Sequence, residues 1–238
     1  MSYHKKTLIM KLENIELQNN ITLHDSDALV VVDIQNDFLP GGALEAPNGD
    51  AIIPNVNKTM EVFNHKNLPI VFTQDWHPKG HYSFASSHEG KNPFDPYEDR
   101  GLGPVLWPDH CVQGSKGAEF ATDLNTHFAE AIIRKGYRKK IDSYSGFVEN
   151  DFKTETGLDG YLKSRGVNRI FVCGLTFDYC AYFTAVDGRD KNYEVVLLTD
   201  LTEPVGAPEG SIERARDDMK HRGVKFTELS AIETGTEV

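Results

Sequence analysis

The chain has 238 residues, 39% of them hydrophobic, and its 36 acidic and 25 basic residues give a formal net charge of −11. This size and composition suit one large domain or at most two small ones. The acidic balance, with no cluster of Lys and Arg interleaved with aromatic residues, argues against nucleic acid and anionic membranes as partners.

Signals of cellular compartment point to the cytoplasm. Three cysteines, Cys111, Cys173 and Cys180, are an odd number without framework spacing, which favours a reducing environment over a disulfide-stapled secreted fold. No apolar run approaches the roughly 20 residues needed to span a bilayer, and residues 1–20 lack the hydrophobic centre of a signal peptide. We therefore expect a cytoplasmic protein.

Hydrophobic patterning predicts an N-terminal arm over residues 1–26, without clear helix or strand signals, and a single domain over residues 27–238. The first strong element is the apolar run Ala28–Val32, which is typical of a strand covered on both faces. In chain order we expect strands over 28–32, 69–72, 131–134, 169–172, 195–198 and 225–227, with helices over 53–65, near 118–124, ending at 165, beginning after 178 and over 209–221.

Alternation of strands and helices indicates a three-layer α/β/α fold, with a mainly parallel sheet of about six strands covered on both faces. Ligands of such sheets bind beyond the carboxyl ends of the strands. Asp33, Asp75 and Lys135 lie at or just beyond the ends of predicted strands, and the loop at Gly174 leads to Cys180. We expect these side chains to gather at one edge of the sheet.

Residues 76–117 form a stretch rich in Pro, Gly, Asp and His that predicts a long loop. A loop of this length inside a compact domain is typical of a functional segment. Within it, the sequence leaves open whether residues 86–106 form a lid or an oligomer contact.

Cys180 is the candidate nucleophile. Asp178 is expected to cap a helix, which places Cys180 in its first turn, where unpaired backbone N–H groups favour a thiolate and lower the cysteine pKa. With Asp33 as proton acceptor and Lys135 as anion stabiliser, the set supplies the parts of acyl transfer. The alternatives are a cysteine packed as a small hydrophobe, a loop-capping aspartate and a solvated lysine in the run RKGYRKK.

A second group of residues has the character of metal ligands. Asp75 and His77 in TQDWHP, with His110 in WPDHC, offer one oxygen and two imidazoles, which suit Zn²⁺, Fe²⁺ or Mn²⁺. The alternative is that the histidines are loop residues bonded to backbone. His81, His88 and Asp109 are weaker candidates.

Five strings occur together and in order: ALVVVDIQNDFLPGGAL, TQDWHP with HYSFAS, LWPDHCVQGSKGAEF, RKG followed by SYSGF, and VCGLTFDYC. In this combination the chain resembles the nicotinamidases of the isochorismatase-like cysteine hydrolase superfamily, from about Ala28 to Phe226. One departure stands at the nucleophile, where many relatives read GLATDYCV and this chain reads GLTFDYCA, with Thr176 and Ala181 replacing Ala and Val.

The resemblance implies a role for each matched position. It implies the catalytic triad Asp33, Lys135 and Cys180, an oxyanion hole from the backbone N–H groups of Thr176 and Cys180, a pyridine pocket walled by Phe38, Trp107 and Tyr144, and metal ligands Asp75, His77 and His110. His81 matches a histidine that joins the metal shell in some relatives. A cis peptide between Leu175 and Thr176 is implied as well. Cys173, in contrast, reads as a buried strand residue without a CxxC partner.

The activity that the resemblance implies is hydrolysis of nicotinamide to nicotinate and ammonia through a thioester, in NAD salvage. One divalent metal is expected, with zinc preferred and iron or manganese as alternatives, and the sequence does not separate nicotinamide from pyrazinamide-like analogues or decide whether the chain forms a homo-oligomer. The competing readings are a cysteine amidohydrolase acting on a ureido or carbamoyl substrate, a catalytically silent metal-binding relative and a redox role for Cys180.

Overall fold

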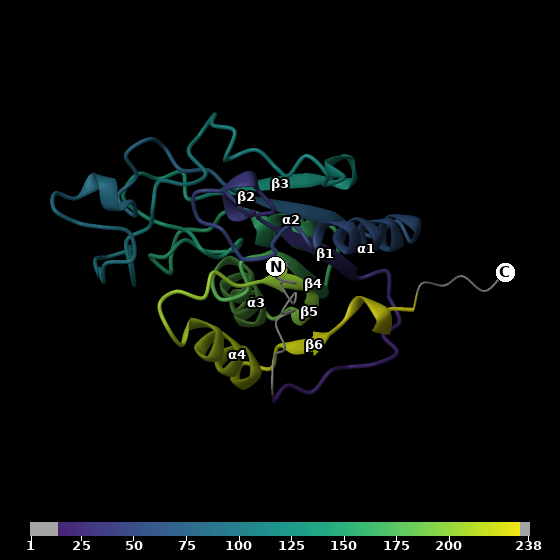
Figure 1. Ribbon diagram of the computed structural model, residues 1–238. Helices are drawn as coiled ribbons and strands as arrows, with labels where there is room; N and C mark the ends of the chain where they lie inside the picture. Colours follow the sequence, from purple (N-terminus) through teal and green to yellow (C-terminus); the bar gives the residue numbers. More distant parts are fainter. Residues whose placement is uncertain (1–13, 234–238) are drawn as a thin grey trace, which may run out of the picture.

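A six-stranded sheet forms the core of the computed structural model, which describes residues 14–233. Every neighbouring pair of its strands is parallel, in the order β3-β2-β1-β4-β5-β6, and Figure 1 shows them stacked from β3 at the top to β6 at the bottom. Its strands are β1 (Asp27–Val32), β2 (Ile70–Asp75), β3 (Ala131–Lys135), β4 (Arg169–Leu175), β5 (Glu194–Glu203) and β6 (Lys225–Thr227).

The helices cover both faces of this sheet. They are α1 (Ile53–His65), α2 (Leu158–Ser164), α3 (Cys180–Asp190) and α4 (Ser211–His221). α1 packs against β1 and β2, whereas α3 packs against β4 and β5 and also against α4. From β1 to β2 the chain moves toward the β3 edge of the sheet, whereas from β4 to β6 it moves toward the opposite edge. Crossovers between parallel strands are right-handed, so these opposite directions place α1 on one face of the sheet and α3 and α4 on the other. The predicted three-layer α/β/α fold is confirmed.

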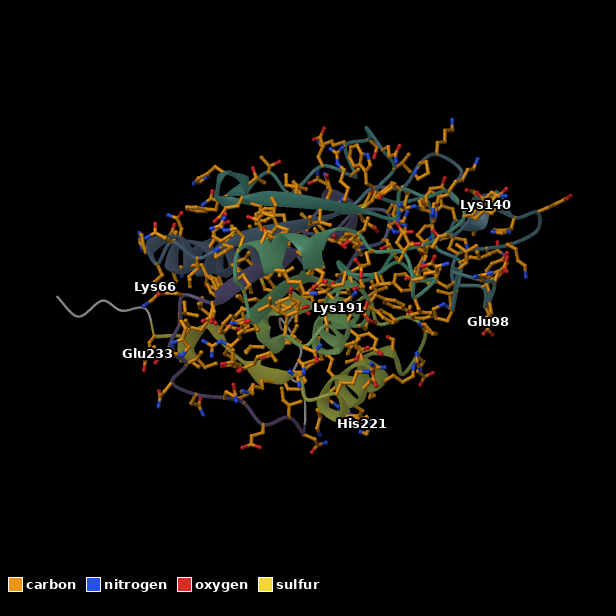
Figure 2. The ribbon with its side chains drawn as sticks, turned by 180° about the vertical axis from the view of Figure 1, so that it is seen from behind. Lys66, Glu98, Lys140, Lys191, His221 and Glu233 are labelled. Carbon is orange, nitrogen blue, oxygen red and sulfur yellow. The ribbon has the colours of Figure 1, made fainter. Side chains whose placement is uncertain are left out.

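Burial explains why the central strands are so apolar. Every residue of β1 is buried, as expected for a strand packed between two layers of helices. β3 lies at the sheet edge and alternates between partly buried and exposed residues, with Ile132 49% exposed. Charged side chains such as Lys66, Glu98 and Lys140 lie at the periphery (Figure 2).

One predicted element is wrong. Residues 118–124 form turns instead of a helix, because residues 34–36 take up the hydrogen bonds of their backbone. Asn36 N donates to Glu119 O, and Ala121 N donates to Ile34 O. β5 is longer than predicted, since after an irregularity in register its residues 202 and 203 pair with the end of β4.

The predicted N-terminal arm lies partly outside the described residues. Residues 1–13 are not described, and the rest of the arm runs beside the β6 region, where Leu17 bridges to Phe226 and Ile21 bridges to Ile232. Within residues 14–233, no helix combines the length and apolar character needed to cross a membrane.

Candidate active site

Three reactive side chains meet at the carboxyl edge of the sheet. Asp33 follows β1, Lys135 ends β3 and Cys180 begins α3. Lys135 Nζ lies 2.8 Å from Asp33 Oδ2 and donates to Cys180 Sγ at 3.3 Å. All three side chains are buried, so the acid, the amine and the thiol that the sequence places at this edge are in direct reach of one another.

The approach to Cys180 depends on a glycine. Gly174 has φ +107°, and a Cβ there would lie 2.1 Å from Val32 O, so only glycine lets the end of β4 pass this close to β1. The peptide between Leu175 and Thr176 is cis, as the resemblance implies. Among the hydrogen bonds of residues 14–233, none uses the backbone N–H of Thr176 or of Cys180, which leaves both free to bind an oxyanion.

Asp178 does not cap α3, contrary to the sequence prediction. Its carboxylate accepts hydrogen bonds from the backbone N–H groups of Val205 and Gly206 and from the Ser211 hydroxyl. Residue 179 precedes the helix without a side-chain cap. Asp178 therefore fixes the loop between β5 and α4 against the nucleophile turn.

The predicted lowering of the Cys180 pKa is also wrong for this closed site. Burial raises the pKa of Cys180 well above its usual range, and the Lys135 ammonium only partly opposes that effect. Burial likewise raises the pKa of Asp33, against the lowering effect of Lys135. Although burial opposes it, the Asp33 and Asp75 carboxylates raise the pKa of Lys135 well above its usual value. A thiol beside an ammonium–carboxylate pair is the resting state that follows.

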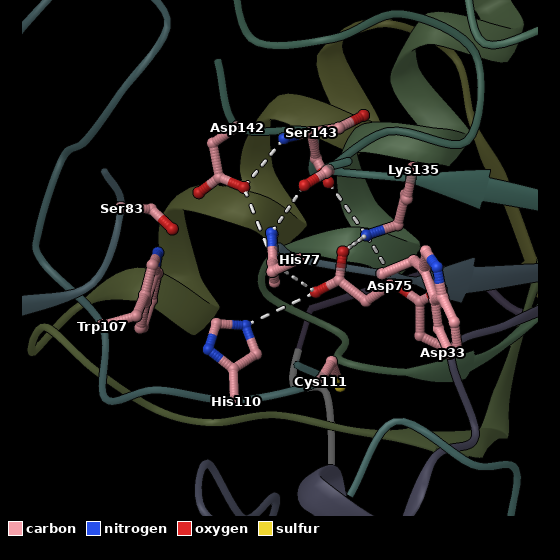
Figure 3. A network of polar contacts seen from close by, with 12 residues as sticks. Asp33, Asp75, His77, Ser83, Trp107, His110, Cys111, Lys135, Asp142 and Ser143 are labelled. Carbon is pink, nitrogen blue, oxygen red and sulfur yellow. Dashed lines mark hydrogen bonds and ion pairs between the residues drawn. The ribbon is translucent and has the colours of Figure 1, made fainter. Parts of the chain in front are cut away.

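The three candidate metal ligands converge on one point. His77 Nε2 lies 3.1 Å and His110 Nε2 3.4 Å from Asp75 Oδ2 (Figure 3). His77 Nδ1 is 2.9 Å from Gly136 O and His110 Nδ1 is 2.8 Å from Pro108 O, so each Nδ1–H donates to a carbonyl. In that neutral tautomer both Nε2 lone pairs face a carboxylate oxygen, an arrangement that is favourable only around a cation or a proton. The donor set fits a divalent metal.

Two residues that sequence reasoning missed hold this cluster in place. Gly136 has φ +67°, and a Cβ there would lie 2.5 Å from His77 Cε1, so a side chain would displace the imidazole. Gln35 forms two hydrogen bonds with the backbone of Asp75: its Oε1 accepts from Asp75 N and its Nε2 donates to Asp75 O, each at 2.8 Å. In the sequence, the signals that could have found them are a glycine directly after Lys135 and a glutamine two residues after Asp33.

Asp75 joins the two groups. Its Oδ1 accepts from Lys135 Nζ at 2.9 Å, while its Oδ2 faces the two histidines. Burial raises the pKa of Asp75, but His77 and Lys135 together hold it well below the usual value. A single carboxylate, ionised at neutral pH, is therefore shared between the candidate triad and the candidate metal centre.

The three weaker metal candidates form hydrogen bonds with other groups of the protein. His81 uses both ring nitrogens within the protein, because Nδ1 accepts from Ser83 and Nε2 donates to the carbonyls of Arg138 and Ile141. His88 Nε2 bonds to Tyr82 O, and Asp109 accepts from the hydroxyl of Ser86. His81 nevertheless lies close enough to His77 and Asp142 for the three to form a second group that could hold an ion.

A narrow cavity connects Cys180 to the metal group. Trp107 Nε1 donates to Tyr144 Oη, which donates to Gly103 O, and the Trp107 and Tyr179 rings are 4.8 Å apart. The cavity has a volume of about 20 Å³. Its lining contains the predicted Phe38, Trp107, Tyr144 and Thr176, and also Leu44, Asp142, Tyr179 and Val205, which were not predicted.

A larger open groove, of about 910 Å³, lies between residues 16–24 and β6. Three of its charged side chains are paired within the protein: Arg169 with Asp27, and Lys225 with Glu194. It contains no cysteine, so the chemistry concentrates in the smaller cavity.

Comparisons with known proteins place this chain among close relatives. A curated nicotinamidase from Acinetobacter baylyi is 44% identical over 203 residues, covering 83% of this chain and 90% of the relative. The PnC1 protein of L. infantum, solved in complex with nicotinate, superposes with a TM-score of 0.77 at 38% identity, covering 90% of this chain and 98% of that one.

The pyrazinamidase of Pyrococcus horikoshii, solved in complex with zinc, superposes with a TM-score of 0.69 at 41% identity, covering 85% of this chain and 99% of that one. The isochorismatase domain family matches residues 27–230, which include every residue of the candidate site. The protein therefore belongs to the isochorismatase domain family.

Proposed function

We propose that this protein is a nicotinamidase, an amidohydrolase that converts nicotinamide and water into nicotinate and ammonia. The observation that carries the proposal is the contact of Lys135 with Asp33, Asp75 and Cys180, which places a nucleophilic thiol beside an Asp–His–His cluster within one aromatic cavity. The 44% identity to a curated nicotinamidase over most of the chain supports the same activity.

In the proposed reaction Asp33 accepts the thiol proton of Cys180, and the sulfur attacks the carboxamide carbon to form a tetrahedral oxyanion. Lys135 stabilises the sulfur anion as it forms, and the N–H groups of Thr176 and Cys180 bind the oxyanion, which is worth about 2.7–4 kcal/mol for one such donor. Asp33 then passes its proton to the departing nitrogen, and ammonia leaves a thioester on Cys180.

Hydrolysis of the thioester uses the same groups. Asp33 accepts a proton from water, whose oxygen attacks the thioester carbon, and the C–S bond breaks to release nicotinate. The released sulfur regains the proton from Asp33, which restores the starting thiol and carboxylate. No net proton is left on the triad after one turnover.

Asp75, His77 and His110 would hold one divalent metal, and zinc suits this ligand set of one oxygen and two nitrogens. When bound, the metal would act as a Lewis acid toward the ring nitrogen of the substrate and so orient the ring. Phe38, Trp107 and Tyr144 would enclose that ring and exclude bulk water. The zinc complex of the P. horikoshii pyrazinamidase supports the choice of metal, and nicotinate release is consistent with a place in NAD salvage.

The test is ammonia release from nicotinamide by the purified chain before chelation, after chelation and after zinc is added back. We expect turnover that is lost on chelation and restored by zinc, and none from metal-loaded Cys180→Ala, which controls for contaminating amidases. Turnover that survives verified metal removal would exclude the metal's role. A metal-loaded enzyme that ignores nicotinamide but hydrolyses a ureido or carbamoyl amide would replace the proposed substrate.

A further inference from the structure

Asp142 carries a buried carboxylate that faces the candidate metal cluster. The residue is 2% exposed and lines the cavity with Asp75 and His110. Its Oδ1 accepts the backbone N–H of Ser143 at 2.8 Å and lies 4.0 Å from His77 Nε2, too far for a hydrogen bond. Its Oδ2 is buried without a hydrogen-bond partner among the described residues, and Figure 3 shows the carboxylate directed toward His77.

No Lys or Arg within residues 14–233 pairs with this carboxylate. The other buried carboxylates nearby are compensated: Asp33 pairs with Lys135, and Glu149, in the same loop as Asp142, pairs with Arg138. Burying a carboxylate without a partner costs several kcal/mol even after relaxation. Among residues 14–233, Asp142 has only the Ser143 N–H and, when protonated, the His77 imidazole at 4.0 Å to offset this cost, and both face Oδ1. A cation held in the cavity would supply the missing compensation.

We propose that Asp142 accepts hydrogen bonds from water molecules on the metal held by Asp75, His77 and His110, and so positions them. This inference rests on the metal site of the proposed function. Asp142 lies close enough to His77 and His81 for the three to share an ion, but both ring nitrogens of His81 are hydrogen-bonded within the protein. The 4.0 Å between Asp142 Oδ1 and His77 Nε2 exceeds the 3.1 and 3.4 Å between Asp75 and the histidines, which suits contact through water.

The backbone keeps Asp142 at this distance. Asp142 N donates to Gly101 O and its carbonyl accepts from Asn150 N, each at 2.8 Å, so the residue is held between two loops. Carboxylates around a metal site that do not bind the ion themselves typically change its affinity 10–100-fold when mutated. Asp142 is therefore a positioning residue, and its removal weakens metal binding without removing a ligand.

The experiment measures zinc affinity by chelator competition in the full chain for wild type, Asp142→Asn and Glu149→Gln. We expect Asp142→Asn to bind zinc about 10–100-fold more weakly. The visible absorption spectrum of its Co²⁺ form should match wild type, because the direct ligands are unchanged. Glu149→Gln removes a buried charge from the same loop and should stay within about twofold of wild type, a matched control for general loop effects.

Stability of the metal-free protein gives a second measurement. Metal-free Asp142→Asn should melt at or above the temperature of metal-free wild type, because a buried charge that no Lys or Arg within residues 14–233 pairs with has been removed. Lower stability, or failure to fold, would overturn the proposal by showing that the protein itself satisfies the carboxylate.

Unchanged zinc affinity in Asp142→Asn would also overturn the proposal, and an altered Co²⁺ spectrum would do so by making Asp142 a direct ligand. If wild type binds no divalent metal, both this inference and the proposed metal role fail. If wild type binds zinc and Asp142→Asn binds it equally well, only this inference fails.

Discussion

At the scale of single residues, the unusual feature is a proposed nucleophile whose pKa is raised by burial. Cys180 lies at a helix start, which favours a thiolate, but desolvation outweighs that effect and raises its pKa. A neighbouring base is then needed to remove the proton when the substrate arrives. Asp33, with its own pKa raised by burial, matches that task more closely than an ordinary aspartate would.

Replacing Cys180 tests this arrangement. Cys180→Ala should lower kcat by more than about 10⁴-fold, because the covalent step is lost, while nicotinamide still binds. Trp107 lies in the cavity and is one of two tryptophans, so its fluorescence reports binding. Cys173 is the matched control: it is buried in β4 and burial raises its pKa, so Cys173→Ala should keep kcat within a fewfold. Steady turnover near wild type in Cys180→Ala would remove it as the nucleophile.

At the scale of elements, the end of β5 carries a carboxylate for which no partner lies among residues 14–233. Glu203 pairs through its backbone with Leu175, beside the nucleophile turn, and burial raises the pKa of its carboxyl to about 7. Because the folded state holds this proton more tightly than the unfolded chain, the stability it supports is fully present below its usual pKa of 4.5. That stability is lost as the pH rises through about 7.

Glu203→Gln should abolish this loss. We expect its melting temperature to match wild type near pH 4.5 and to exceed wild type at pH 8, since the buried charge is absent. Thermal melts across that range measure the difference. Glu194→Gln, at the other end of β5 and paired with Lys225, should show no such divergence. Parallel melting curves for Glu203→Gln and wild type at every pH would contradict the assigned pKa.

At the scale of the whole molecule, the site is assembled from segments that are far apart in sequence. Asp33, Asp75 and Lys135 follow or end three adjacent strands, His110 comes from the long loop and Cys180 from α3. In Figure 1 the irregular loops gather beyond the carboxyl ends of the strands, where they enclose the site. A metal bound by Asp75, His77 and His110 would tie the long loop to the sheet.

Metal removal should therefore lower global stability. A ligand at 1,000 times its dissociation constant stabilises the folded state by about 4.1 kcal/mol, and each kcal/mol shifts the melting temperature of a chain this size by about 2–4 °C. Chelation should lower the melting temperature of wild type. The melting temperature of His110→Ala should already be low without chelator and should change little when chelator is added. His88→Ala, which changes a half-buried loop histidine bonded to Tyr82 O, should respond like wild type. An equal response in His110→Ala and wild type would exclude His110 from the metal site.

Much of the fold could be read from local pattern. Continuous apolar runs predict buried parallel strands, because both faces of such strands are covered, and helical spacing in α1 predicts its bounds at Ile53 and His65. Local pattern also predicts a helix after residue 178, but the expected side-chain cap is absent, so that signal does not account for the start of α3 at Cys180. Strand ends carry the candidate reactive groups, and parallel topology brings the ends of neighbouring strands together, so Asp33, Asp75, Lys135 and Cys180 could be grouped before any coordinates.

By itself, then, the sequence determined the sheet, the helix faces and the residues that gather at the carboxyl edge, since these depend on periodicity and chain order. Tertiary structure decided what depends on distant neighbours. Residues 118–124 are not a helix, because the segment after β1 takes up their hydrogen bonds, and Asp178 binds the loop after β5 instead of capping α3. The Cys180 pKa rises, and Asp142 Oδ2 is buried beside the candidate metal cluster without a hydrogen-bond partner among residues 14–233, because desolvation and neighbouring charges arise only when separate segments pack together.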